Sequence, residues 1–215
     1  MMVEGFGNTI LITLGALAIG VVIGTLIAVV KYCAEDTKAL KPLAWLCDIY
    51  VTVIRGVPVV VLLLIFYFII MTSAEGIAVG ILTFGINSGA YMAELIRGGI
   101  NSVDRGQMEA GRSLGMSKLQ AMRKIIFPQA LRYILPAIGN ELIALLKETS
   151  ILGMVGATVG TLTFDLNAAS GTIFRTIPNY LASGIVVGCF YLAVVYLMVF
   201  LIKLVEKRMK ASDQR

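Results

Sequence analysis

The sequence predicts an all-α membrane protein, a single domain of residues 1–215 with about five transmembrane helices. Of its 215 residues, 58% are hydrophobic and only 14% are charged, and its mean hydropathy is +0.89. Soluble domains average roughly 45–50% apolar and about 25% charged residues. The apolar residues gather in runs long enough to cross a bilayer, where a helix satisfies its own backbone hydrogen bonds. The basic residues lie in short loops rather than on one exposed face, so the net charge of +5 does not indicate a nucleic-acid partner.

The first three expected spans are separated by short polar segments. The run 6–30 is the first span, and lysines follow it. The second, 42–71, is interrupted by Gly56 and Pro58, and we expect a bend there because proline removes a helical hydrogen bond. The third, 76–100, is rich in glycine and serine.

A charged segment, residues 103–127, follows the third span and is named the elbow here. Its apolar residues recur at roughly helical spacing, which a water-soluble linker would lack. Asp104 and Ser117 are each followed three residues later by a glutamine, the spacing of a helix N-cap and its partner. Gly115 lies between them and can adopt the left-handed conformation that ends a helix. The elbow should therefore contain two short helices that meet at an angle.

The rest of the chain contains two further expected spans. The fourth begins near Pro128 and carries charged residues within its apolar body. Residues 149–179 are weakly hydrophobic and rich in glycine and threonine, so we expect broken or re-entrant structure. The fifth span is 180–204, and a basic tail follows it.

The charges of the loops predict the orientation in the membrane. Lysine and arginine fill 31–41, 97–132 and the tail after residue 202, whereas the opposite loops hold Glu4, Glu75 and Asp165 with only Arg175 as a basic residue. By the positive-inside rule the N-terminus lies outside and the C-terminus lies in the cytoplasm. The elbow then faces the cytoplasm.

Polar residues inside the third and fourth spans are candidates for substrate binding, because charged groups are costly there and face a partner or an aqueous cavity. Glu141 and Glu148 are two helical turns apart and share one face. Polar residues of the third span also share one face, which ends at Glu94, a residue that could instead pair with Arg97. The carboxylates would attract an ammonium or guanidinium group, while an amide and a hydroxyl would bind a carboxylate or amide. The candidate substrate-binding residues are Asn87, Ser88, Tyr91, Glu141 and Glu148.

Two less specific interpretations of these charges remain open. The glutamates could pair internally with Lys147 and only hold helices together. Lys147 and Ser150 could form the Ser–Lys dyad of an intramembrane enzyme, but their i, i+3 spacing is common by chance. The chain has no histidine, and we expect no catalytic residue and no metal site. It also lacks a GxxxxGK[ST] phosphate-binding loop, so we expect no ATP hydrolysis by the chain itself.

Motifs in four regions carry a resemblance to a known family. In the elbow and the residue that follows it, an ordered set is similar to the cytoplasmic coupling motif of permease subunits in ABC importers: Glu109, Ala110, Gly115, Ile125 and Pro128. Gly111 departs from it, because a second alanine is usual there. IRGVP at 54–58, INSGAYMAELIRGGI at 86–100 and GNELIALLKETSI at 139–151 resemble the polar amino acid uptake branch. Val57 and Leu62 stand where that branch usually has threonine and glutamine, so a bend is the favoured role of this segment.

The resemblance implies the type I ABC importer permease fold, with the elbow as its coupling-helix loop. The implied ATPase-docking residues are Glu109, Ala110, Gly111, Leu114, Gly115 and Met116. For Glu109 alone, an acidic residue near a helix N-terminus also stabilises the helix dipole. The chain itself would bind no cofactor, because ATP and Mg would be used by a separate ABC ATPase subunit dimer.

The implied assembly has further members. About five spans are too few to enclose a solute pathway, so a second copy or a sister permease should complete it. The resemblance adds an extracytoplasmic amino-acid-binding protein and a location in the bacterial inner membrane. The complex would take up a polar amino acid. The acidic pair favours a cationic one, although the same carboxylates could bind the α-ammonium group common to all amino acids. The alternative is an autonomous secondary carrier or channel, which needs no docking elbow.

Overall fold

The computed structural model describes residues 2–155 and 180–212, and every regular element in these two segments is a helix. The first half consists of α1 (Met2–Asp36), η1 (Lys38–Leu40), α2 (Lys41–Gly56), α3 (Val59–Ile65), the π-helical turn η2 (Phe66–Ile70) and α4 (Gly76–Asn101). The second half consists of α5 (Arg105–Ser113), α6 (Lys118–Ala121), the π-helical turn η3 (Met122–Ile126), α7 (Phe127–Glu148), the 3₁₀ segment η4 (Thr149–Val155) and α9 (Tyr180–Ser212). The all-helical prediction is confirmed for this part of the chain.

Three helices of the described segments are long and apolar enough to cross a membrane: Glu4–Asp36, Gly76–Asn101 and Gly184–Arg208. The bent pair Lys38–Gly56 and Val59–Ile70, whose two parts meet at 103°, passes the same test of length and composition when taken together, and such a pair forms either a broken span or a re-entrant loop. The bend expected at Gly56 and Pro58 is therefore confirmed. The predicted fourth span corresponds to α7, which is more polar and is not among these crossings. Of the segment expected to be broken, 149–155 form η4, and 156–179 lie outside the described residues.

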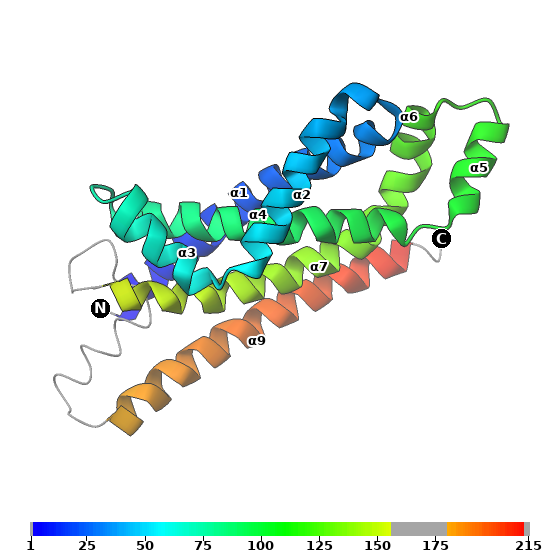
Figure 1. Cartoon of the computed structure of the whole chain (residues 1–215). Coiled ribbons are helices and arrows are strands. Elements are labelled where there is room, and N and C mark those ends of the chain that lie inside the picture. Colours follow the sequence, from blue (N-terminus) through cyan, green and yellow to red (C-terminus); the bar gives the residue numbers. More distant parts are fainter. Residues whose placement is uncertain (1, 156–179, 213–215) are drawn as a thin grey trace.

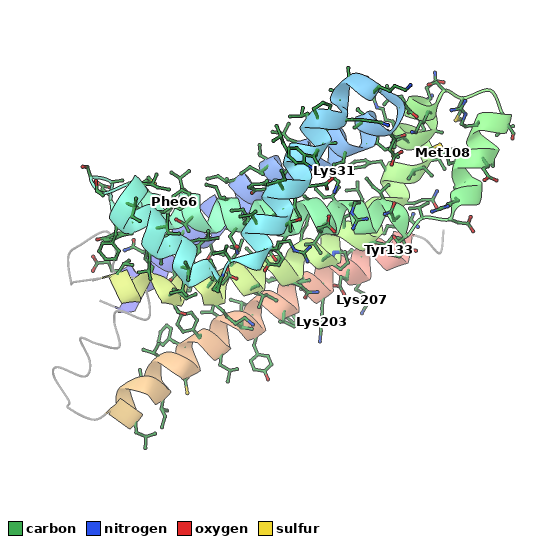
Figure 2. All side chains as sticks on the ribbon, in the orientation of Figure 1. Lys31, Phe66, Met108, Tyr133, Lys203 and Lys207 are labelled. Carbon is green, nitrogen blue, oxygen red and sulfur yellow. The ribbon has the colours of Figure 1, made fainter. Side chains whose placement is uncertain are left out.

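Helix α4 lies at the centre of the bundle, packed against α1, α2, α3 and α7 (Figure 1). In its most apolar window 67% of the residues are buried, compared with 6% for α9, which packs along α7 on the outside. The elbow lies at one end of the bundle, and α1 begins at the other. Lys203 and Lys207 lie on the outer side of α9, on the half that ends near the elbow (Figure 2).

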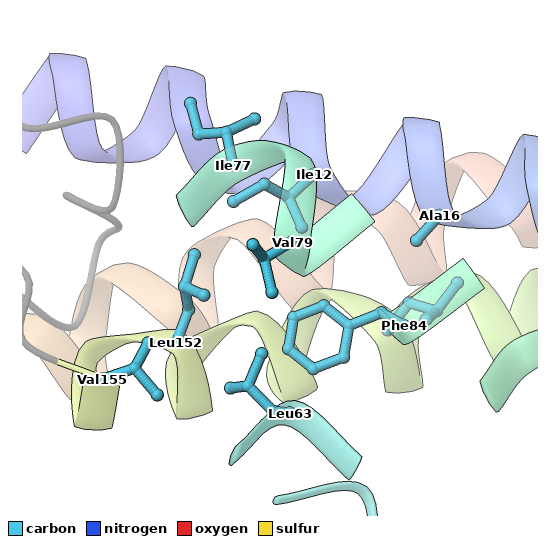
Figure 3. Close-up of a cluster of buried hydrophobic side chains, with 9 residues drawn as sticks. Ile12, Ala16, Leu63, Ile77, Val79, Phe84, Leu152 and Val155 are labelled. Atoms are coloured by element: carbon cyan, nitrogen blue, oxygen red, sulfur yellow. The ribbon is translucent and has the colours of Figure 1, made fainter. Parts of the chain in front are cut away.

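Apolar contacts hold the end of the bundle opposite the elbow. Phe84 of α4 and Ile12 of α1 are fully buried there, together with Leu63 of α3 and Leu152 of η4 (Figure 3). A second cluster joins the other end of α4 to the elbow and α7, with Ile96, Val103, Ile126, Ala130 and Ile134 as its buried members. The elbow is thus packed onto the bundle and not only tethered to it.

The two elbow helices begin at the predicted caps. The Asp104 carboxylate accepts a hydrogen bond from the backbone N–H of Gly106 at 2.7 Å. Ser117 and Gln120 form a complete capping box, in which each side chain accepts a hydrogen bond from the other residue's backbone N–H. These side chains satisfy backbone donors that the first turn of a helix leaves free.

Gly115 ends α5 with a positive φ of 84°, as predicted. Its N–H donates to the Arg112 carbonyl at 3.0 Å, and the N–H of Met116 donates to the Gly111 carbonyl at 3.1 Å. This pair of hydrogen bonds is a Schellman motif, which closes a helix and turns the chain. The angle between α5 and α6 therefore depends on one glycine.

Candidate functional site

Four of the five residues predicted to bind substrate meet between α4 and α7. Ser88 is fully buried, and its Oγ donates a hydrogen bond to Oε1 of Glu141 at 2.8 Å. Asn87, only 3% exposed, lies close enough to the Glu148 carboxyl group for its side-chain amide to interact with it. The two carboxylates are close enough to interact electrostatically. The residues named here as the glutamate cluster are Asn87, Ser88, Glu141 and Glu148.

The glutamate cluster contains two carboxyl groups without a matching cation among the described residues. Lys147 is exposed, and no ion pair joins it to Glu141 or Glu148 among the described residues. The internal pairing considered for Lys147 is therefore absent from this part of the chain. In its place, neutral donors on α4 hold the carboxylates. Charged groups at such depth usually face a cationic partner or an aqueous cavity.

Room for one of these donors comes from a glycine on α1. A Cβ atom placed on Gly20 would lie 2.8 Å from Oγ of Ser88, closer than such atoms can approach. Any side chain at this position would displace the hydroxyl that reaches Glu141. Sequence reasoning missed Gly20, since a glycine within a membrane span has many possible roles.

Tyr91 lies one turn farther along α4 and faces α2 instead. Its ring stacks on the guanidinium of Arg55, 5.2 Å from the ring centroid. Both residues line a cavity of about 460 Å³ together with Asp48, Thr52 and Glu94. Tyr91 therefore belongs to a charged cavity beside α2, next to the glutamate cluster along the bundle.

Glu94 is the centre of an ion-pair network around this cavity. It pairs with Arg97 at 2.6 Å, as the sequence suggested, and lies 4.0 Å from Arg55 and 3.9 Å from Lys31. Lys31 pairs in turn with Asp48 at 2.6 Å. Here the acidic groups are matched by cations, in contrast to the glutamate cluster. The sequence did not predict Lys31 of α1 and Arg55 of α2 as partners of Glu94, because only folding brings these helices next to α4.

The elbow presents most of its predicted docking residues to solvent. Leu114 is 80% exposed, an unusual exposure for a large apolar side chain. Glu109, Ala110 and Gly115 are also exposed, and Met116 is partly buried. Gly111 differs from the others, since it is buried and a Cβ there would lie 2.9 Å from Cδ1 of Ile125. Its role in the structure is the close packing of α5 on η3, and an alanine there would force the Ile125 side chain to shift.

No group of three or more His, Cys, Asp or Glu side chains able to hold a metal ion occurs within residues 2–155 and 180–212.

Comparisons with known proteins identify the family. Residues 20–211 match the family described as "Binding-protein-dependent transport system inner membrane component". A putative glutamine transport system permease protein of Rickettsia bellii is 36% identical over 215 residues, covering 98% of this chain and 94% of that protein. The arginine transport system permease protein ArtQ of Bacillus subtilis is 33% identical over 217 residues, covering 99% and 94%.

Solved structures agree with the sequence relatives. The crystal structure of an amino acid ABC transporter with histidines has a chain that is 37% identical, with a TM-score of 0.87, covering 96% of this chain and 93% of that one. The MetNI methionine ABC transporter in an inward-facing conformation matches with a TM-score of 0.80 at 22% identity, covering 97% and 95%. The second match supports the fold alone. The chain therefore belongs to the inner membrane components of binding-protein-dependent transport systems, the permease subunits of ABC importers.

Proposed function

We propose that this chain is the permease subunit of an ATP-driven importer of a polar amino acid, and that a cationic side chain is preferred. The observation that carries the proposal is the glutamate cluster, where Glu141 and Glu148 are held by neutral donors and lack a cation among the described residues. A substrate ammonium or guanidinium would supply that cation. The named relatives, a putative glutamine permease and an arginine permease, fit a polar amino acid of either charge.

Within the binding region, we assign the carboxylates to the positive group of the substrate. Asn87 and Ser88 orient these carboxylates and remain able to contact an amide or carboxylate of the substrate. Tyr91 and the charged cavity lie on the elbow side of the cluster, so we assign them to the path along which the substrate leaves. We assign different roles to the two sites because the acidic groups of the charged cavity are already paired with cations, whereas those of the glutamate cluster are not paired among the described residues.

The elbow, residues 103–127, is proposed as the docking site of the ABC ATPase dimer, within a permease domain that extends over 1–215. The exposed apolar side chain of Leu114 and the tight turn at Gly115 suit insertion into a groove of a partner. ATP and Mg would act in that ATPase, and this chain would bind no cofactor. ATP-driven closure would move the elbows and alternate the access of the spans.

The proposed complex lies in the bacterial inner membrane with the N-terminus outside and the C-terminus in the cytoplasm. The elbow end of the bundle carries the basic residues of the loops and the tail, including Lys203 and Lys207 (Figure 2). A second copy of the chain or a sister permease would complete the pathway, and an extracytoplasmic amino-acid-binding protein would deliver substrate. The proposal includes no nucleic-acid partner.

The test is ATPase activity in lipid vesicles that contain this chain, its ATPase subunit and a panel of amino acids with the binding protein. We expect one class of polar amino acids to stimulate the ATPase activity, and we expect the Glu141→Gln variant to lose this stimulation. Transport by this chain alone, without nucleotide, would contradict the proposal and favour a secondary carrier.

A further inference from the structure

Two neighbouring cavities lie where the elbow meets the ends of α1 and α4. The first has a volume of about 320 Å³, within the range of small-ligand pockets, and contains both polar and apolar lining residues. The second has a volume of about 110 Å³ and is almost entirely apolar. Both are lined by Tyr32, Ile100 and Met122, so these three side chains form the junction between the two cavities.

The first cavity carries charges of both signs. Arg105 and Lys118 contribute two cations and Glu35 contributes a carboxylate. The Lys118 ammonium lies 3.3 Å from Glu35 and 2.7 Å from Asp36, and the hydrogen bond to Asp36 raises the Lys118 pKa, which keeps this amine charged. Arg105 has no ion-pair partner among the described residues. The cavity is therefore lined by a guanidinium without an ion-pair partner in the described residues and by an exposed carboxylate.

A buried polar atom lies at the junction of the two cavities. The Tyr32 hydroxyl oxygen is shielded from solvent, and it has no hydrogen-bond partner among the residues that the structure describes. A buried hydroxyl without a partner is costly. A ligand oxygen at the junction would supply the missing hydrogen bond.

The second cavity extends along the membrane-spanning part of α1. Val29 and Thr25 line it one and two turns before Tyr32, away from the elbow. Val29 is 54% exposed and Phe127 is 43% exposed, so the groove opens on the surface of the bundle. An apolar groove that leads from a polar cavity into the membrane suits an amphiphile with one headgroup and a hydrocarbon chain.

We propose that these two cavities form a binding site for one aminophospholipid. The phosphate contacts Arg105 and Lys118, the ammonium of the headgroup contacts Glu35, and an acyl chain lies in the groove along α1. An anionic headgroup without an amine brings no cation to Glu35, whose carboxylate already shares the Lys118 ammonium with Asp36, so it binds more weakly. A free zwitterion such as an amino acid has no group for the apolar groove.

The test is native mass spectrometry of the full-length chain in detergent with equimolar dioleoyl phosphatidylethanolamine and dioleoyl phosphatidylglycerol. We expect the wild-type chain to retain phosphatidylethanolamine. Arg105→Ala removes the free cation and Val29→Trp fills the groove, so each should lower the retained fraction about tenfold. Their matched controls are Arg123→Ala, an exposed basic residue outside both cavities, and Val22→Trp, at a position that is 59% exposed on the same helix.

Three results would overturn the proposal. The first is a wild-type chain that retains no lipid, or retains phosphatidylglycerol as well as phosphatidylethanolamine. The second is retention by either cavity variant equal to that of its control. The third is equal competition by glycerophosphoethanolamine, which carries the headgroup without acyl chains and would indicate a site for a small polar ligand.

Discussion

The turn at Gly115 allows a test that separates backbone conformation from side-chain size. Its φ of 84° lies in the left-handed region, where an alanine costs about 1–2 kcal/mol and asparagine is tolerated better. A Cβ at this position would meet no other atom of the chain within 4 Å, so no internal clash adds to that cost. If the ATPase binds only the turned elbow, Gly115→Ala should weaken its binding by about 5–30-fold. Gly115→Asn, although larger, should weaken it by less than about threefold.

The measurement is equilibrium binding of the ATPase subunit to the permease in lipid nanodiscs, with thermal unfolding as a check on the fold. The opposite order, in which Gly115→Asn is worse than Gly115→Ala, would refute the conformational reasoning. Steric bulk at the interface would then be the controlling factor. Equal binding by both variants and the wild type would remove Gly115 from the docking site altogether.

Two further predictions concern the glutamate cluster. Glu148→Gln keeps the shape of the side chain and removes its charge, so uptake of a cationic amino acid should fall about tenfold more than uptake of a neutral one; equal losses would show that Glu148 is structural. Gly20→Ala would bring a Cβ within 2.8 Å of the Ser88 hydroxyl and 2.9 Å of the Ser88 Cβ, so α1 and α4 must separate at Ser88 and substrate-stimulated ATPase activity should fall about tenfold. Gly7→Ala is its control, because nothing lies within 4 Å of a Cβ there, and unchanged stimulation in Gly20→Ala would argue against the role of Ser88.

Local features of the fold were predictable because they depend on short stretches of chain. The caps at Asp104 and Ser117 follow from side chains that reach backbone donors two or three residues away. The same holds for the turn at Gly115 and for the bend at Pro58, which lacks a backbone N–H. The all-helical membrane fold follows from composition and from the length of the apolar runs.

Contacts between distant segments could not be predicted from the sequence. The hydrogen bond from Ser88 to Glu141 joins residues 53 positions apart, and no helical periodicity specifies which faces of two spans meet. Tyr91 shares a helix face with Asn87 in sequence, yet its ring contacts Arg55 on another helix. The position of Gly111 in a motif placed it among the predicted docking residues. In the structure it is buried, because α5 packs against η3.

The docking elbow and the glutamate cluster are connected by one helical path. Elements α6, η3 and α7 follow each other without a break from Lys118 to Glu148, a path of about 45 Å at helical rise. A displacement of the elbow therefore has a continuous backbone path to Glu141 and Glu148, and η3 and Pro136 are the points on it where the helix can bend. Coupling between two binding sites is reciprocal in free energy. If ATPase closure at the elbow changes the affinity of the glutamates for substrate, substrate at the glutamates must change the affinity of the elbow for the closed ATPase by the same factor.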